Sequence, residues 1–223
     1  MRTSKIFSIL LLGATAAFAN LAASTPVGRG AGDYLGDPYT LTVCASCAKA
    51  LPAESTTVVL DGMKDRALDG TQIKCCSTEC VEAFKANPAG ALAKVHAEIL
   101  KTPATAYPLK NCFMMRDEVL DESAKSVVYQ NRVYKVCCKK CAVRFGNDSA
   151  KRAKEWESLV IDAQKASYPL KTCVISGKPI EGDGAWVVVQ NRAYHLCCPG
   201  CASGVRADPA KFAAMLDAAS KTK

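Results

Sequence analysis

The stretch YHLCCPGC at residues 194–201 places three cysteines within five positions, directly after a run of β-favouring residues. Related stretches occur about sixty residues upstream as YKVCCKKC at 134–141, and further upstream as KCCSTEC at 74–80. One or two cysteines precede each cluster: Cys173, Cys112, and Cys44 with Cys47. Because thiols that recur in register converge on a soft metal ion or on each other, sulfur chemistry decides how this chain folds.

The similarity between the copies extends beyond the cysteines. YPLKNC at 107–112 matches YPLKTC at 168–173, and VVYQNRVY at 127–134 matches VVVQNRAY at 187–194. The first copy is looser, since it begins with YTLTVC at 39–44 and carries a longer insert before its cysteine cluster. Self-similarity at a fixed period indicates a repeat architecture. The sequence therefore predicts three cysteine-rich modules, numbered here by residue range: 39–102 for module 1, 107–166 for module 2 and 168–220 for module 3.

The N-terminus has the features of an export signal. Arg2 and Lys5 precede an apolar stretch that ends with Ala17-Phe18-Ala19, a small-residue cleavage pattern. The alternative is a membrane anchor, but the stretch is short for a bilayer span and rich in small residues. No later segment predicts a membrane span. We predict a periplasmic or secreted product with a signal peptide at 1–19 and a flexible leader at 20–38.

Size and composition limit how the modules are held together. Each has about sixty residues, near the lower limit for folding on a hydrophobic core alone, and aromatic residues make up only 7% of the chain. Modules of this kind usually need disulfides or a structural metal.

The net charge is +8, of which Arg2 and Lys5 contribute two, and the other Lys and Arg residues are dispersed. Dispersed charge is typical of solvated helix faces, so we expect no nucleic-acid partner.

Each module is predicted to contain a β-hairpin that ends on its cysteine cluster. In module 3, β-branched and aromatic residues flank Asn191-Arg192, and Asn tolerates the left-handed backbone of a tight turn. Module 2 repeats this pattern around Asn131-Arg132. Module 1 offers two dipeptides for its turn, Asp61-Gly62 or Asp69-Gly70.

Helices are predicted after each hairpin. Cys197 and Cys201 are four positions apart, so a helical first turn places both thiols on one face. Asp208 and Pro209 are a favoured cap and first residue for a closing helix, whose apolar stripe follows at Phe212, Met215, Leu216 and Ala219. We therefore predict an α+β fold of three tandem small treble-clef-like modules, each a β-hairpin plus one or two helices.

Each module resembles a known family over almost its whole length, and module 3 does so most clearly. Its YHLCCPGC at 194–201, followed by ADPAKF at 207–212, is similar to the YHS domain and the related TRASH domain, which are small treble-clef-like modules. The resemblance implies binding of heavy metals, as in transport, resistance and sensing proteins. The doubled cysteine departs from the family pattern, which more often has a small polar residue at the second place. The implied ligand triads are Cys173, Cys197 and Cys201 in module 3, Cys112, Cys137 and Cys141 in module 2, and Cys44, Cys80 and either Cys76 or Cys75 in module 1.

The cysteine spacing itself predicts a thiolate metal site in each module. Cys44 and Cys47, with Cys75 or Cys76 and Cys80, offer four thiolates for a closed tetrahedral site. Modules 2 and 3 reach four thiolates only by using both vicinal cysteines; otherwise water, a histidine or a partner takes the fourth place. We predict up to one Zn²⁺, Cu⁺ or other soft ion per module. The predicted ligands are Cys44, Cys47, Cys76, Cys80, Cys112, Cys137, Cys141, Cys173, Cys197 and Cys201, with Cys75, Cys138 and Cys198 as further candidates.

The predicted function is the binding of soft metal ions for sequestration or delivery, with a metal-donor or metal-acceptor protein as partner. A rival hypothesis is a protein-interaction module stapled by zinc or by disulfides, because oxidising compartments favour disulfides. A bridge such as Cys112–Cys141 is feasible, although thirteen cysteines cannot all pair within one chain. A third hypothesis is a redox enzyme using Cys44-Ala45-Ser46-Cys47, but no thioredoxin-like alternation of strands and helices surrounds it. No catalytic motif is evident, and we predict no enzymatic activity.

Overall fold

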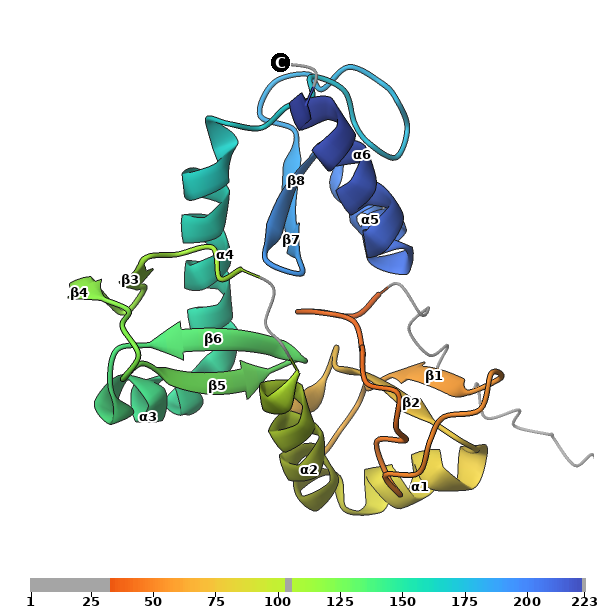
Figure 1. The fold of residues 1–223 in the computed structure, drawn as a ribbon. Coiled ribbons are helices and arrows are strands. Elements are labelled where there is room, and N and C mark those ends of the chain that lie inside the picture. The colour runs from red at the N-terminus through yellow and green to blue at the C-terminus, as the bar shows by residue number, and fades with distance from the viewer. Residues whose placement is uncertain (1–32, 103–105, 222–223) are drawn as a thin grey trace, which may run out of the picture.

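The computed structural model describes residues 33–102 and 106–221, whose arrangement Figure 1 shows. The predicted signal peptide at 1–19 and most of the predicted leader at 20–38 lie outside the described residues. The described chain is a mixed fold of helices and four small two-stranded antiparallel sheets. None of the helices within those ranges combines the length and apolar composition that a bilayer crossing requires.

Module 1 consists of a loop, a hairpin and two helices. The hairpin pairs β1 (Thr56–Val59) with β2 (Gln72–Cys75), and the helices are α1 (Thr78–Ala86) and α2 (Pro88–Lys101). The connection between the strands is a long loop containing the 3₁₀ helix η1 (Arg66–Leu68), rather than one tight turn. Both predicted turn glycines, Gly62 and Gly70, adopt positive φ within it.

Modules 2 and 3 repeat this order of elements. Module 2 also has a short sheet made by β3 (Asn111–Cys112) and β4 (Met115–Val119), which the sequence did not predict. The remaining elements of module 2 are β5 (Lys125–Tyr129), β6 (Arg132–Val136), α3 (Lys139–Asn147) and α4 (Ser149–Lys165). Those of module 3 are β7 (Ala185–Val189), β8 (Arg192–Leu196), η2 (Pro199–Cys201), α5 (Ala202–Ala207) and α6 (Pro209–Lys221).

The tight turns of modules 2 and 3 lie one residue before the predicted position. Gln130 and Asn131 have φ of 48° and 60°, and Gln190 and Asn191 have φ of 50° and 65°. Positive φ at both central residues is typical of the type I′ turn, whose twist matches that of the flanking strands. Each following arginine therefore belongs to the returning strand, where Arg132 pairs with Tyr129 and Arg192 with Val189.

The helix starts differ in whether a side chain caps the free backbone N–H groups. The Asp208 carboxylate accepts a hydrogen bond from Lys211 N at 3.1 Å, which confirms the predicted cap of α6. Ser77 caps α1 by accepting from Cys80 N at 3.4 Å. The corresponding residues, Cys138 before α3 and Cys198 before η2, make no side-chain cap.

Each module has its own cluster of buried side chains, and the clusters of modules 2 and 3 meet. Module 1 packs around Ile73 and Phe84, which are fully buried. Trp156 lies at the centre of the module 2 cluster, which also includes Val188 and Ala193 from the module 3 hairpin. The small modules therefore bury apolar surface against each other as well as internally.

Residues 33–38 differ from the flexible leader that the sequence predicted for 20–38. Tyr34 is fully buried, and its hydroxyl donates to Arg206 O of module 3 at 2.8 Å. Leu35 N donates to Gly70 O of module 1 at 2.8 Å. Gly36 has φ of +70° and lies so close to the module 2 turn that an added Cβ would collide with the backbone oxygen of Gln130. This segment is ordered because it fills the space where the three modules meet.

Arg132 occupies that junction and is fully buried. Its guanidinium pairs with Glu157 at 2.7 Å and with Asp37 at 3.0 Å. The same group donates to two backbone oxygens, Gly36 O at 2.9 Å and Val188 O at 2.6 Å. One buried cation thus connects the 33–38 segment, module 2 and the hairpin of module 3.

Candidate metal centres

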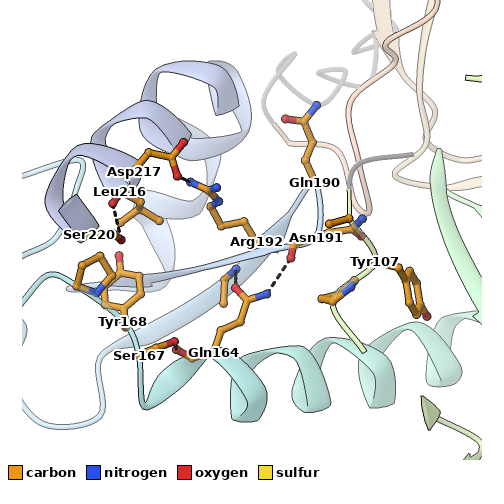
Figure 2. A pocket seen from close by; sticks show the side chains of 14 residues that line it. Tyr107, Gln164, Ser167, Tyr168, Gln190, Asn191, Arg192, Leu216, Asp217 and Ser220 are labelled. Atoms are coloured by element: carbon orange, nitrogen blue, oxygen red, sulfur yellow. Dashed lines mark hydrogen bonds and ion pairs between the residues drawn. The ribbon is translucent and has the colours of Figure 1, made fainter. Parts of the chain in front are cut away.

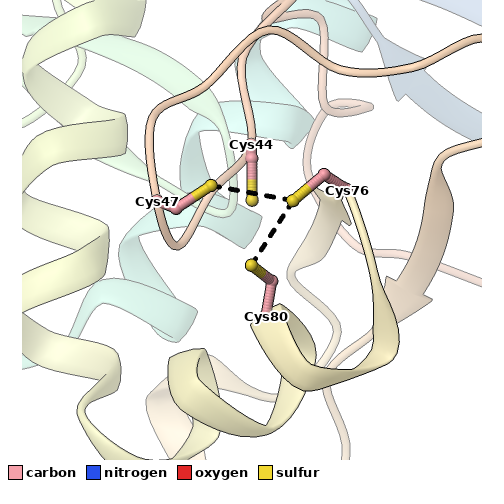
Figure 3. Close-up of side chains that lie close together, drawn as sticks. All are labelled: Cys44, Cys47, Cys76 and Cys80. Carbon is pink, nitrogen blue, oxygen red and sulfur yellow. Dashed lines mark hydrogen bonds between the residues drawn. The ribbon is translucent and has the colours of Figure 1, made fainter.

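Four thiols of module 1 converge from a loop and a helix start (Figure 3). Cys44 and Cys47 belong to a tight loop closed by the bridge between Val43 and Ala50, with Cys44 N donating to Lys49 O at 2.7 Å. Cys76 precedes α1 and Cys80 lies in its first turn. All four sulfur atoms lie within 4.8 Å of one another, and we call this group site 1.

Modules 2 and 3 each bring three thiols together in the same way. Their sulfur atoms also lie within 4.8 Å of one another. We call these groups site 2 (Cys112, Cys137 and Cys141) and site 3 (Cys173, Cys197 and Cys201). The structure therefore gathers all ten predicted ligands into three groups, one per module.

The sulfur separations match the edges of a thiolate tetrahedron. A metal–sulfur bond of about 2.3 Å in a tetrahedral site places neighbouring sulfurs about 3.8 Å apart. The Cys76–Cys80 and Cys47–Cys76 separations are 3.4 and 3.6 Å, and the Cys137–Cys141 and Cys197–Cys201 separations are 3.8 and 3.7 Å. A disulfide requires about 2.05 Å, and all thirteen cysteines are free thiols.

The three further candidates lie outside these groups, in two different kinds of position. Cys75 is the last residue of β2 and is fully buried in the module 1 core, so Cys76, not Cys75, faces the other thiols of site 1. Cys138 is half-buried beside site 2, and Cys198 is exposed beside site 3, with its sulfur 3.7 Å from that of Cys201. We call Cys138 and Cys198 the rim thiols.

The first cysteine of each site is buried and surrounded by backbone N–H donors. Burial would raise the pKa of the Cys44 thiol, yet N–H groups of Cys47, Cys76 and Ser46 outweigh it and lower the pKa to about 6. The Cys173 thiol has the same balance: burial opposes ionisation, but N–H groups of Cys197, Ser176 and Ile175 lower its pKa to about 6. Each site thus stabilises one thiolate before any cation arrives.

The thiols at the helix starts do not ionise as easily. Hydrogen bonds with the thiols of Cys80, Cys47 and Cys44 raise the pKa of Cys76 to about 12. Burial and the neighbouring thiols raise the pKa of Cys201 to about 12 as well. Several thiolates within 4.8 Å repel each other, and a bound cation removes that repulsion. The repulsion between neighbouring thiolates therefore favours the binding of a cation at each site.

One position decides whether a site has a fourth thiol; the cysteine spacing identified Cys47 there but not its counterparts in modules 2 and 3. Three residues after the first cysteine, module 1 has Cys47, module 2 has Met115 and module 3 has Ser176. The Ser176 hydroxyl lies 3.4 Å from the sulfur of Cys197. Aligning the copies on their first cysteines, Cys44, Cys112 and Cys173, would have identified this position. Site 1 is a four-thiol set, whereas sites 2 and 3 are three-thiol sets.

Replacing Ser176 with cysteine is expected to convert site 3 into a four-thiol site. The new sulfur takes the place that Cys47 has in site 1, and a fourth thiolate should raise the affinity for Zn²⁺ at least tenfold, which is about 1.4 kcal/mol. Competition with a zinc chelator measures the change. Ser167→Cys is the control, because Ser167 lines a pocket whose described lining includes no cysteine. An unchanged affinity in Ser176→Cys would mean that this position does not face the ion.

A pocket of about 470 Å³ lies between modules 2 and 3 (Figure 2), and none of its described lining residues is a cysteine. Its polar groups bond to each other: Gln164 Nε2 donates to Asn191 O at 2.9 Å, and Ala193 N donates to Gln164 Oε1 at 2.8 Å. Arg192 pairs with Asp217 at 2.7 Å. Gln164 thus joins module 2 to module 3, and Arg192 and Asp217 pair within module 3, so we place the chemistry at the sulfur groups and not in this pocket.

Comparisons with protein-family models, with curated proteins and with solved structures return no match for this chain. The functional interpretation therefore depends on the geometry of the three thiol groups.

Proposed function

We propose that this chain is an exported protein that binds soft metal ions through cysteine thiolates, up to one ion per module, and sequesters or delivers them. The observation that carries the proposal is the grouping of ten thiols into three sets with mutual sulfur distances within 4.8 Å. Thiolates select soft ions such as Cu⁺ and Zn²⁺ over hard ions such as Mg²⁺. The three-thiol sites leave room in the coordination shell for a ligand from a donor or an acceptor.

The resemblance to the YHS and TRASH domains is part of this proposal. Its support is the order of elements in each module: one cysteine (two in module 1) before a hairpin, the hairpin, and two cysteines at a helix start. That order is the one expected of a treble-clef-like module. An exported protein with this site chemistry would hold ions outside the cytoplasm, where free thiols are otherwise scarce.

A second candidate function is a protein-interaction module in which the metal is structural. The closed four-thiol set of site 1 favours it, because structural zinc sites typically have four protein ligands. The two functions differ in how the ions exchange. A structural ion is held permanently, whereas sequestration or delivery requires ions that leave.

Elemental analysis with thiol counting tests the proposal on protein taken from its native compartment without added reductant. We expect up to three ions per chain, reduced cysteines, and ions at sites 2 and 3 that exchange with a competing chelator. Three unexchangeable ions would favour the structural function instead. Oxidised cysteines with no bound element would contradict both, and would leave a disulfide-stapled scaffold.

A further inference from the structure

The rim thiols occupy a position that module 1 fills with a serine. In module 1, Ser77 separates the two helix-start ligands and caps α1 through Cys80 N. Cys138 and Cys198 take the same place in modules 2 and 3 but cap nothing. Serine is among the best capping residues and cysteine is not. Helix capping therefore does not explain why positions 138 and 198 are cysteines.

The rim thiols lie against the three-thiol sites without belonging to them. The sulfur of Cys198 is 3.7 Å from that of Cys201, and its side chain is exposed. Cys138 adjoins Cys137 in sequence and directly precedes α3, whose first turn carries Cys141, and its side chain is half-buried. Neither rim thiol is part of the groups in which every sulfur lies within 4.8 Å of the others. Each is thus a further thiol beside a three-thiol site, exposed at Cys198 and half-buried at Cys138.

We propose that Cys138 and Cys198 are transfer ligands, which bind a soft metal ion transiently as it enters or leaves sites 2 and 3. The inference rests on the proposed metal-binding function. In the step, a bond forms between the ion and the rim sulfur while the bond to one site sulfur breaks. The proton lost by the rim thiol passes to the departing sulfur through solvent, and the ion keeps its oxidation state. An incoming thiol of an acceptor molecule then repeats the exchange from the solvent side.

Module 1 lacks the two features that such a transfer uses, namely an open fourth place at the site and a rim thiol. Its fourth place is filled by Cys47, and its rim residue is Ser77. Its additional cysteine, Cys75, is fully buried and has no access to solvent. The proposal therefore divides the sites into one that retains its ion and two that exchange ions with thiol-bearing molecules.

The test measures the release of Cd²⁺ from the full-length chain to excess dithiothreitol, followed as the cadmium that stays with the chain after rapid desalting. The sulfur-to-cadmium charge-transfer absorbance confirms loading before dithiothreitol is added. The variants are Cys138→Ser, Cys198→Ser and the double variant, each of which introduces the residue that module 1 has naturally. We expect the double variant to slow release from sites 2 and 3 at least tenfold, with equilibrium affinities changed less than threefold. Ser77→Cys is the reciprocal variant and should speed release from site 1.

Three results would overturn the inference in different ways. Unchanged release rates in the double variant would mean that the rim thiols take no part in transfer. A tenfold loss of equilibrium affinity would make them permanent ligands. A wild-type chain with no cadmium absorbance would refute the proposed function itself, and the transfer role with it. Circular dichroism of the variants checks that the serines, as capping residues, leave the helices intact.

Discussion

Replacing Cys80 with alanine is expected to remove the ion of module 1 and to leave the other two in place. The substitution deletes one of four thiolates that converge from a loop and a helix start. We expect the affinity of site 1 for Zn²⁺ to fall at least a thousandfold, which is about 4 kcal/mol. Since a module of this size depends on its staple, its thermal stability should fall as well. Native mass spectrometry would report two ions per chain instead of three.

Cys75→Ala is the matched control for this prediction. Cys75 neighbours Cys76 in sequence, but its side chain is fully buried in the core and outside the four-thiol group. Its loss should reduce the free energy of unfolding by about 1 kcal/mol, a typical effect of a small core truncation, and should keep three ions bound. The assignment of ligands in module 1 is wrong if Cys75→Ala loses the ion and Cys80→Ala keeps it.

Replacing Arg132 with alanine is expected to lower the free energy of unfolding by about 3 kcal/mol, because removing one partner of a buried ion pair leaves the other charges uncompensated. Arg132 is fully buried and pairs with Asp37 and Glu157. It also supplies donors to Gly36 O and Val188 O, which become unsatisfied. Modules 2 and 3 and the 33–38 segment should then separate before the individual cores unfold, which denaturant unfolding followed by tryptophan fluorescence would detect.

Arg192 provides the internal control, because it occupies the same place in the module 3 hairpin. Its side chain is partly exposed and pairs with Asp217 at the surface. Exposed pairs contribute little, so Arg192→Ala should cost at most about 1 kcal/mol. Equal losses of unfolding free energy in the two variants would show that Arg132 contributes no more than Arg192 to holding the modules together. Neither variant should change the number of bound ions, since neither arginine contacts a sulfur group.

Much of the local structure could be predicted because short-range rules determine it. Asp208 and Pro209 indicated the start of α6, which begins at Pro209 with the expected cap. The four-residue spacing of Cys197 and Cys201 predicted thiols on one face of a helical turn, and their sulfurs lie 3.7 Å apart. Such features depend on neighbouring residues alone, so the sequence contains what is needed to find them.

The features that were missed depend on contacts between distant residues. The four-residue spacing from Cys80 favoured Cys76 as the ligand but left Cys75 open, and the pairing of β2 with β1 turns Cys75 into the core. Residues 33–38 have the composition of a loop, yet Tyr34 is buried because three modules surround it. The two hairpin turns lie one residue before their predicted positions. The strand register pairs Arg132 with Tyr129 and Arg192 with Val189, so each arginine belongs to a strand and not to the turn.

By itself, the sequence determined that there are three copies of one cysteine module, and which thiols are close enough in each copy to act together. The tertiary structure alone decided that Cys75 lies in the core and not at site 1, and that a buried arginine joins modules 2 and 3 to the 33–38 segment. The reason is physical. Helical spacing and the motifs within each copy involve residues that are close together in the sequence. Burial and metal coordination depend on which distant segments the folded chain brings together.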